Sequence, residues 1–264
     1  MECSLDEKSA IMSYQQERSY GITADPLAQF ACAFSALIHD ADHPGVPNSQ
    51  LVKENTDLAA RFGGQSVAEQ NSLSHCFGLF SEPRFKNLRR ALFASDADQT
   101  RFRQMVVNSL MATDIADKSL KEQRNKRWEA AFSLSETTQE SPATIADRRA
   151  TVVLEHLILA SDVSHTMQHW NVYRKWNEKL LEEMYLAHKN GRSTADPTKD
   201  WAKGEIGFFD FYIIPLAQKL KECGVFGVAG DEYLNYAQIN RRKWEVEGAD
   251  TTAEMVARIQ RAYP

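Results

Sequence analysis

Apolar side chains recur every three to four residues along most of the chain, the spacing that places them on one face of an α-helix. Residues 27–42 and 146–161 show this pattern over several turns. Alternation with a period of two, typical of a half-buried strand, does not persist anywhere, and no internal repeat is visible. The pattern predicts an all-α protein. Residues 1–24 are interpreted as a linker or the remnant of a preceding region, and residues 25–264 as one compact multi-helix domain.

Capping residues indicate where several helices begin. Asp25 and Ser141 are each followed by proline, and this order is typical of a helix start because the first side chain caps free N–H groups and proline fits the first turn. Ser66 and Glu69 form a capping-box pair, and Asp98 is expected to cap a further helix. The predicted helices span residues 27–42, 49–62, 68–80, 84–93, 98–115, 120–134, 146–161, 168–190, 201–223, 231–246 and 251–262.

Charge and cysteine usage narrow the class of protein. A formal net charge of −5 argues against a nucleic-acid partner. The four cysteines are widely separated and form no CxxC pair, so a reducing compartment is expected. No apolar run approaches the ~20 residues that a membrane helix needs, and the polar N-terminus is unlike a signal peptide. We expect a cytoplasmic chain without a membrane segment; a membrane-anchored parent protein stays open.

The strongest candidate for chemistry is the segment Ala-Leu-Ile-His-Asp-Ala-Asp-His-Pro-Gly-Val-Pro-Asn at residues 36–48. His39 and His43 are four residues apart, so on a helix they would share one face, with Asp40 beside them. Imidazole and carboxylate together suit a zinc-type ion, with magnesium or manganese on the carboxylate side. The alternative is a polar helix C-terminus at which histidine complements the helix dipole.

Asp162 is the second candidate, because it ends a helix that the pattern predicts to be buried. A buried carboxylate loses hydration and is costly unless it has a partner, and a metal ion is one such partner. The alternative is an aspartate that caps the following helix.

Together these residues carry a resemblance to a known family. His-Asp-x-x-His-Pro-Gly-x-x-Asn at 39–48 resembles the signature of the class I 3′,5′-cyclic-nucleotide phosphodiesterases, all-helical HD-type enzymes with two metal ions. Residues 160–165 are similar to the family's Ala-Asp-Leu-Ser-Asn element, and the resemblance covers roughly residues 25–244. It implies that two divalent ions, zinc and magnesium or manganese, are held by His39, Asp40 and Asp162.

The resemblance also implies roles for residues around the metal ions. His43 and Glu69 match catalytic residues of the family that lie next to the metal-bound water molecules. Without the resemblance, His43 would be interpreted as a histidine that complements the helix dipole, and Glu69 as the glutamate of a capping box. Thr113 and Asp114 resemble a family element whose residues contact the metal ligands without binding the metal themselves.

A purine pocket is implied by the segment Gly-Glu-Ile-Gly-Phe-Phe-Asp at 204–210, which resembles the family's Gln-x-Gly-Phe segment. Phe208 would stack on the purine and Ile206 would press on its other face. Tyr173 and Trp176 match a family element near the site.

Two positions in this pocket depart from the family pattern. Position 165 is His where the family commonly has Asn, and position 205 is Glu where the family has a Gln that reads the purine edge. A carboxylate only accepts hydrogen bonds, and guanine offers two adjacent donors. Glu205 therefore favours cGMP, or the use of both nucleotides, whereas His165 leaves the choice of purine open.

The most serious departure is the absence of the family's upstream His-Asn-x-x-His element, which supplies the proton donor and one zinc ligand. None of the seven histidines precedes His39. Because loss of a positioned acid typically costs ~10²–10⁴-fold in rate, we expect this chain to be weakly active or inactive. We also expect that the first helices of the catalytic domain are missing and that a longer parent, with an upstream signalling domain as one option, hydrolyses cyclic nucleotides.

The predicted function is metal-dependent hydrolysis of cAMP or cGMP, or both, to 5′-nucleoside monophosphates. Two alternatives stay open at this point. One is a catalytically impaired relative that binds a ligand or regulates a partner, and the other is a different HD-type metal phosphohydrolase. The sequence does not distinguish the metals, the preferred nucleotide or the oligomeric state.

Overall fold

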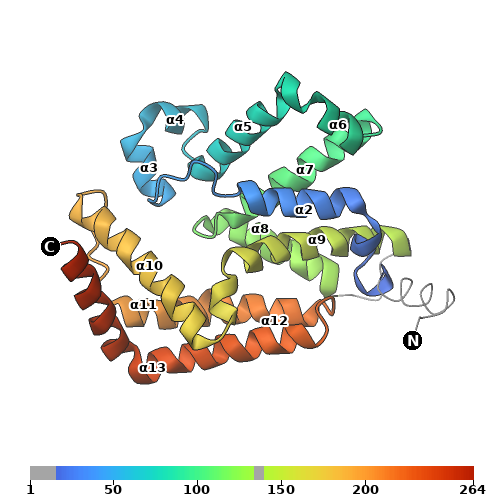
Figure 1. The fold of residues 1–264 in the computed structure, drawn as a ribbon. Coiled ribbons are helices and arrows are strands. Elements are labelled where there is room, and N and C mark those ends of the chain that lie inside the picture. Colours follow the sequence, from blue (N-terminus) through green and yellow to red (C-terminus); the bar gives the residue numbers. More distant parts are fainter. Residues whose placement is uncertain (1–15, 134–139) are drawn as a thin grey trace, which may run out of the picture. The chain divides into compact units, whose positions relative to one another are not determined.

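The computed structural model describes residues 16–133 and 140–264, and these residues form helices and no strands (Figure 1). The all-α prediction is therefore confirmed. The chain divides into two compact units. Unit 1 comprises the residues up to Asp42 together with Ala68–Asp162, and unit 2 comprises His43–Val67 together with Val163–Pro264. The predicted boundary between residues 24 and 25 stays a prediction.

Unit 1 contains the helices α2 and α5 to α9, and α5 begins at Val67, one residue before the second segment of the unit. In this unit α2 packs against α7 and α9, and α8 packs against α9. The elements are η1 (Ile22–Ala24), α2 (Pro26–Ile38), α5 (Val67–Ser81), η2 (Pro83–Phe85), α6 (Lys86–Leu92), α7 (Asp96–Thr113), α8 (Lys118–Phe132) and α9 (Pro142–Asp162).

Phenylalanine side chains form the centre of the unit 1 core. The Phe102 side chain, 1% exposed, lies with its ring centroid 5.7 Å from that of Phe30, 5.5 Å from Phe34 and 5.3 Å from Phe93. Ring pairs at these separations add to the free energy gained by burying apolar area. The stack joins α2 to α7, and it therefore fixes the helix that carries His39 at its C-terminal end.

Unit 2 is organised around its long last helix, α13, which packs along α10, α11 and α12 (Figure 1). The fully buried Asn240 of α13 donates hydrogen bonds from Nδ2 to the carbonyl oxygens of Thr166 (2.9 Å) and Gln168 (2.8 Å). The elements are α3 (Asn48–Glu54), α4 (Thr56–Arg61), η3 (Ser164–Met167), α10 (Trp170–Lys189), α11 (Trp201–Phe208), the π-helical turn η4 (Phe209–Ile213), α12 (Ile214–Glu222) and α13 (Val228–Ala262).

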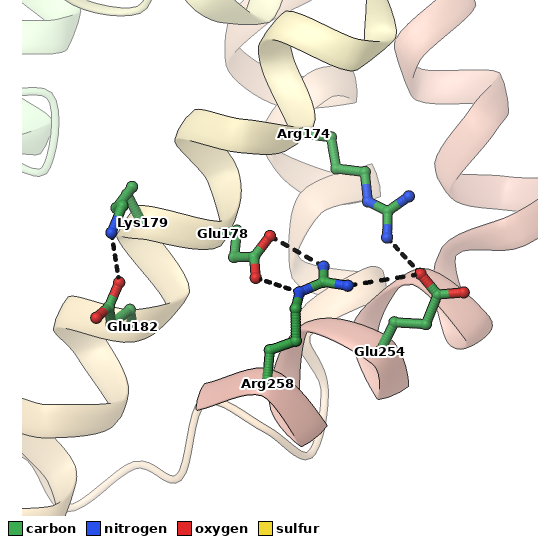
Figure 2. A network of polar contacts seen from close by, with 6 residues as sticks. All are labelled: Arg174, Glu178, Lys179, Glu182, Glu254 and Arg258. Carbon is green, nitrogen blue, oxygen red and sulfur yellow. Dashed lines mark hydrogen bonds and ion pairs between the residues drawn. The ribbon is translucent and has the colours of Figure 1, made fainter. Parts of the chain in front are cut away.

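A network of ion pairs joins the C-terminal half of α13 to α10 (Figure 2). The Arg258 guanidinium binds both carboxylate oxygens of Glu178, at 2.6 and 2.9 Å, and lies 3.9 Å from Glu254, which also pairs with Arg174. Single exposed ion pairs contribute about 0–1 kcal/mol, but shared two-point contacts restrict orientation more strongly. The network therefore fixes the direction of α13 beside α10.

Several predicted helix ends are confirmed and others are wrong. Asp25 Oδ1 accepts from Ala28 N at 3.0 Å, and Ser141 Oγ accepts from Thr144 N at 3.2 Å, as predicted. The helix α7 is capped by Ser95, whereas Asp98 is the third helical residue and completes a capping box with it. The Ser66–Glu69 capping box stays a prediction.

Some helices are divided or joined differently from the prediction. The segment 49–62 breaks at Asn55, whose side chain accepts from Leu58 N and caps α4. The segments predicted as 231–246 and 251–262 form one helix, because the Thr251 side chain is buried and continues the inward face of α13. Within residues 16–133 and 140–264, no helix is long and apolar enough to cross a membrane.

We expect Phe102→Ala to lower the free energy of unfolding by about 3–5 kcal/mol, because it removes the ring at the centre of the unit 1 core. Chemical denaturation followed by circular dichroism measures the change. Leu37→Ala on α2, where the side chain is 81% exposed, is the control and should cost less than about 0.5 kcal/mol. Equal losses for the two variants would contradict the described core.

Candidate functional site

His39, Asp40 and Asp162 come together in unit 1, where the C-terminal ends of α2 and α9 meet. His39 Nε2 lies 3.3 Å from Asp40 Oδ2 and 3.4 Å from Asp162 Oδ1. One ligand atom from each residue lies within 4.8 Å of the others, and in the described part of the chain this is the one such group of three. The side chains stay open to solvent, at 23% for His39, 63% for Asp40 and 31% for Asp162.

The orientation of the His39 ring is set by the helix that it ends. Nδ1 lies 2.9 Å from the carbonyl oxygen of Ala36 and donates its proton there, which leaves Nε2 facing the two carboxylates. A backbone carbonyl that fixes one ring nitrogen in this way is the usual support of a metal-binding histidine. Asp162 is the last residue of α9, so its position follows from the length of that helix.

The carboxylates of Asp40 and Asp162 lie at the C-terminal ends of α2 and α9, where a nearby positive charge stabilises them. The C-terminal end of a helix carries about half a negative charge, which repels a carboxylate placed there. Neither α2 nor α9 has a basic residue in its last turn. The His39 imidazolium supplies a cation: hydrogen bonds to Asp162 and then Asp40 raise the pKa of His39 to about 10.

The geometry of the three side chains fits a divalent ion. Ligand atoms at ~2.1 Å from a tetrahedral zinc ion lie ~3.4 Å from one another, which matches the two separations from His39 Nε2. The donor set of one imidazole and two carboxylates is also one that zinc, manganese or magnesium accepts. The predicted ligands therefore form a group that can hold a metal ion.

His43 does not share a helical face with His39, contrary to the prediction. The helix α2 ends at Ile38, and Asp42 adopts a left-handed backbone conformation with φ of 64°. This conformation turns the chain out of the helix before His43 is reached. His43 belongs to unit 2, where its Nδ1 accepts from Gly45 N at 3.2 Å.

The other residues matched to the metal region lie in unit 1. Glu69 is in the first turn of α5. Thr113 ends α7 and donates to the carbonyl oxygen of Leu110, whereas the buried Asp114 carboxylate accepts from the backbone N–H groups of Ala116 and Asp117. Asp114 therefore orders the turn between α7 and α8, and the role that the resemblance gives to this pair stays a prediction.

The residues predicted to bind the purine belong to unit 2, where several of them are brought together. Tyr173 Oη donates a hydrogen bond to Glu205 Oε2 at 2.5 Å, and the rings of His165 and Tyr173 stack at 6.0 Å. Ile206 follows Glu205 along α11, and Phe208 is two residues after Ile206, where its ring stacks on Tyr212 at 5.4 Å.

Glu205 is held by groups whose own orientation is fixed by tryptophan. Trp244 Nε1 donates to Tyr173 Oη at 2.6 Å, and Trp201 Nε1 donates to Asn177 Oδ1 at 2.9 Å. Indole nitrogens only donate, so Tyr173 directs its own proton toward Glu205 and Asn177 presents its NH₂ group to the same carboxylate. Burial raises the pKa of Glu205, and these two hydrogen bonds act in the opposite direction.

Sequence reasoning missed part of unit 2. Asn177, Trp201 and Trp244 were not identified, although a buried asparagine inside an amphipathic helix is a detectable signal. Next to Tyr173, α10 also carries an exposed apolar row at a spacing of four residues, which continues from Trp176 to Leu180 and Met184. Contiguous exposed apolar surface is a feature of binding faces.

A cavity of about 690 Å³ lies within unit 1 and is separate from the predicted site. It is lined by α2, α7, α8 and α9, with alanines such as Ala28 and Ala146 along its floor and the ion pair between Arg127 and Glu155 at its wall. None of the predicted site residues lines it. The volume of this cavity therefore says nothing about the metal group.

Comparisons with known proteins give one consistent result. A family model described as 3′5′-cyclic nucleotide phosphodiesterase matches residues 8–225. The probable 3′,5′-cyclic phosphodiesterase pde-1 of Caenorhabditis elegans is 29% identical over 197 residues, which cover 72% of this chain and 27% of that protein. The dual specificity calcium/calmodulin-dependent 3′,5′-cyclic nucleotide phosphodiesterase 1C of Mus musculus is 29% identical over 194 residues, which cover 70% and 25%.

Among solved structures, the phosphodiesterase domain of the rhodopsin phosphodiesterase of Salpingoeca rosetta has the same fold. Its TM-score is 0.68 at 21% identity, and the match covers 93% of this chain and 75% of that domain. The chain spans about a quarter of the length of the two curated relatives.

We expect zinc affinity to rise with pH because zinc must displace the proton on His39. The folded pKa, about 10, lies above the ordinary value of 6.5, so in metal-free protein the imidazolium contact stabilises the fold fully below pH 6.5 and is lost as pH rises through about 10. The affinity should increase about tenfold per pH unit between about pH 6.5 and about pH 8.5. Competition with a chromophoric chelator measures it.

The control for this experiment is His75→Ala on α5, which should keep the pH slope, whereas His39→Ala should abolish it together with most of the affinity. A zinc affinity of the parent chain that does not change with pH would show that His39 is not the protonated ligand.

Proposed function

Since the chain belongs to the 3′5′-cyclic nucleotide phosphodiesterase family, as the sequence resemblance predicted, we propose that it hydrolyses a 3′,5′-cyclic nucleotide to the 5′-nucleoside monophosphate. The observation that carries the proposal is the convergence of His39, Asp40 and Asp162, which are 123 positions apart at the extremes, into one group of ligand atoms. A structural helical domain would have no reason to place two carboxylates at two helix C-termini around one imidazole.

The metal part of the proposal assigns two divalent ions, zinc and magnesium or manganese, to this group. When bound, such ions neutralise charge on phosphoryl oxygens and lower the pKa of a water molecule toward ~7. His39 contributes Nε2, which the carbonyl of Ala36 keeps in place. Asp162 would bind the same ion as His39, and the more exposed Asp40 carboxylate would also reach the second ion. Glu69 and His43 are assigned to proton handling by their match to the family.

The nucleotide base is assigned to residues of unit 2. Phe208 offers an aromatic face and Ile206 an aliphatic one, and the exposed row on α10 that contains Trp176 adds apolar surface of the kind that binding sites use. Aromatic faces bind any purine, so they supply affinity without distinguishing adenine from guanine. Discrimination then falls to polar groups such as Glu205 and His165.

Glu205 supports a preference for cGMP. Tyr173 and Asn177 both donate to it, and burial together with the nearby Glu205 charge raises the pKa of Tyr173 well above 10, so its hydroxyl keeps the proton that it donates. A carboxylate held in this way can only accept from a ligand, and guanine presents N1–H and N2–H as adjacent donors.

A second candidate function is nucleotide binding with little or no turnover. It is favoured by one sequence observation, the absence of any histidine before His39, which leaves the matched proton donor without a counterpart in this chain. Slow turnover and tight binding would then coexist.

The purified chain, loaded with zinc and magnesium, should convert cyclic nucleotide to 5′-nucleotide at a rate about 10²–10⁴-fold below that of an enzyme with a positioned acid. Chromatography of the products at high protein concentration detects this rate. Asp162→Asn should remove the remaining activity, and Asp231→Asn, an exposed carboxylate on α13, should not. Product formation that survives both chelation and Asp162→Asn would refute the proposed site.

Glu205→Gln should shift the preference toward cAMP, because an amide donates as well as accepts. The measurement is the ratio of cAMP to cGMP turnover, or of their dissociation constants if turnover is too slow, in the variant and the parent. Asp210→Asn, which changes an exposed acid next to the same helix, is the matched control. An unchanged ratio in Glu205→Gln would rule out this residue as the purine reader.

A further inference from the structure

The turn that follows His39 and Asp40 is held by the neighbouring helix α5. Asp42 ends this turn with φ of 64°, in the left-handed region that side-chain-bearing residues seldom adopt. Such a conformation costs about 1 kcal/mol or more and persists only where the surroundings hold it in place. The contacts around Asp42 therefore show what maintains the turn.

Two adjacent residues of α5 provide those contacts. Ser72 Oγ donates to the carbonyl oxygen of Ala41 at 2.7 Å, and Asn71 Nδ2 donates to Asp42 Oδ2 at 3.1 Å. Ser72 is 1% exposed and the bond is part-buried, so loss of the bond would leave the buried hydroxyl without this partner, which is costly. Both bonds span about thirty residues along the chain and end on the residues directly after the two metal ligands.

Apolar packing continues the same contact. Ile38, the last residue of α2, lies in one buried cluster with Leu73 and Cys76 of α5. The helix α5 is therefore joined to the end of α2 by side chains that directly precede His39 and by hydrogen bonds that directly follow Asp40. The two ligands cannot shift without breaking one or the other.

The same helix carries Glu69, three residues before Ser72 and so on the same face of α5. The hydrogen bond from Ser72 to Ala41 thus also restricts rotation of the part of α5 that carries Glu69. One contact between α5 and the turn therefore orients both elements.

We propose that Asn71 and Ser72 are positioning residues of the metal site, which hold the turn after α2 so that His39 and Asp40 face Asp162. The proposal rests on the proposed function, because it takes these three residues as metal ligands. Residues that support metal ligands without touching the ion typically change the affinity by about 10–100-fold when they are replaced.

The test is zinc affinity, measured on the full chain by competition with a chromophoric chelator. Ser72→Ala and Asn71→Ala should each weaken zinc binding about tenfold, and Ser72→Thr, which keeps the hydroxyl, should restore most of the affinity. Ser81→Ala is the matched control, because Ser81 Oγ donates to Phe77 O within the same helix and touches no ligand-bearing turn. It should leave the affinity unchanged.

A second measurement separates positioning from general stability. Thermal unfolding in the presence of a chelator reports the stability of each variant without metal, and Asn71→Ala should change it little because its side chain is only partly buried. Weaker zinc binding by Asn71→Ala at unchanged metal-free stability supports the proposal. If Ser72→Ala and Asn71→Ala bind zinc as the parent chain does, the positioning role is overturned while the metal site stands. If the parent chain itself does not bind zinc, the proposed metal site fails first.

Discussion

The repulsion between two carboxylates at the C-terminal ends of α2 and α9 is the constraint on which the site depends. Both helices end with negative dipole ends directed at Asp40 and Asp162, and neither offers a basic residue in its last turn. Only a cation between these side chains makes the arrangement favourable, whether it is the His39 imidazolium or a bound metal ion. The raised pKa of His39 and the fit to a metal ion are thus two consequences of one electrostatic arrangement.

A different constraint operates in unit 2. There, the direction of the hydrogen bonds around Glu205 is set by tryptophan N–H groups, which can donate but cannot accept. Trp201 and Trp244 donate and never accept, so Asn177 and Tyr173 each use their remaining donor in a hydrogen bond to Glu205. A glutamine at position 205 would meet the same two donors with one acceptor oxygen and one donor group. The replacement of the family's glutamine by glutamate is therefore compatible with its surroundings here, because Tyr173 and Asn177 both donate to it.

Whether a structural feature could be predicted depended on how far apart in the sequence the interacting residues are. The caps at Asp25 and Ser141 were found because capping involves residues three positions apart, and the three metal ligands were found because their neighbours resemble a family signature. The shared helical face of His39 and His43 was wrong, since the left-handed Asp42 ends the regular spacing. Aspartate adopts that conformation more readily than most residues, but the contacts that hold it there come from Asn71 and Ser72, about thirty residues further along the chain.

The sequence by itself determined that the chain is all-helical, roughly where most of its helices lie, and which family it belongs to. These properties follow from spacing, capping and motif letters within a few residues of one another. Tertiary structure alone decided that Asp162 reaches His39, that the ring presents Nε2, and that α5 holds the turn after Asp40. Those outcomes depend on how the helices pack. Packing brings together side chains that are far apart in the sequence, and their separation in the sequence does not predict their distance in space.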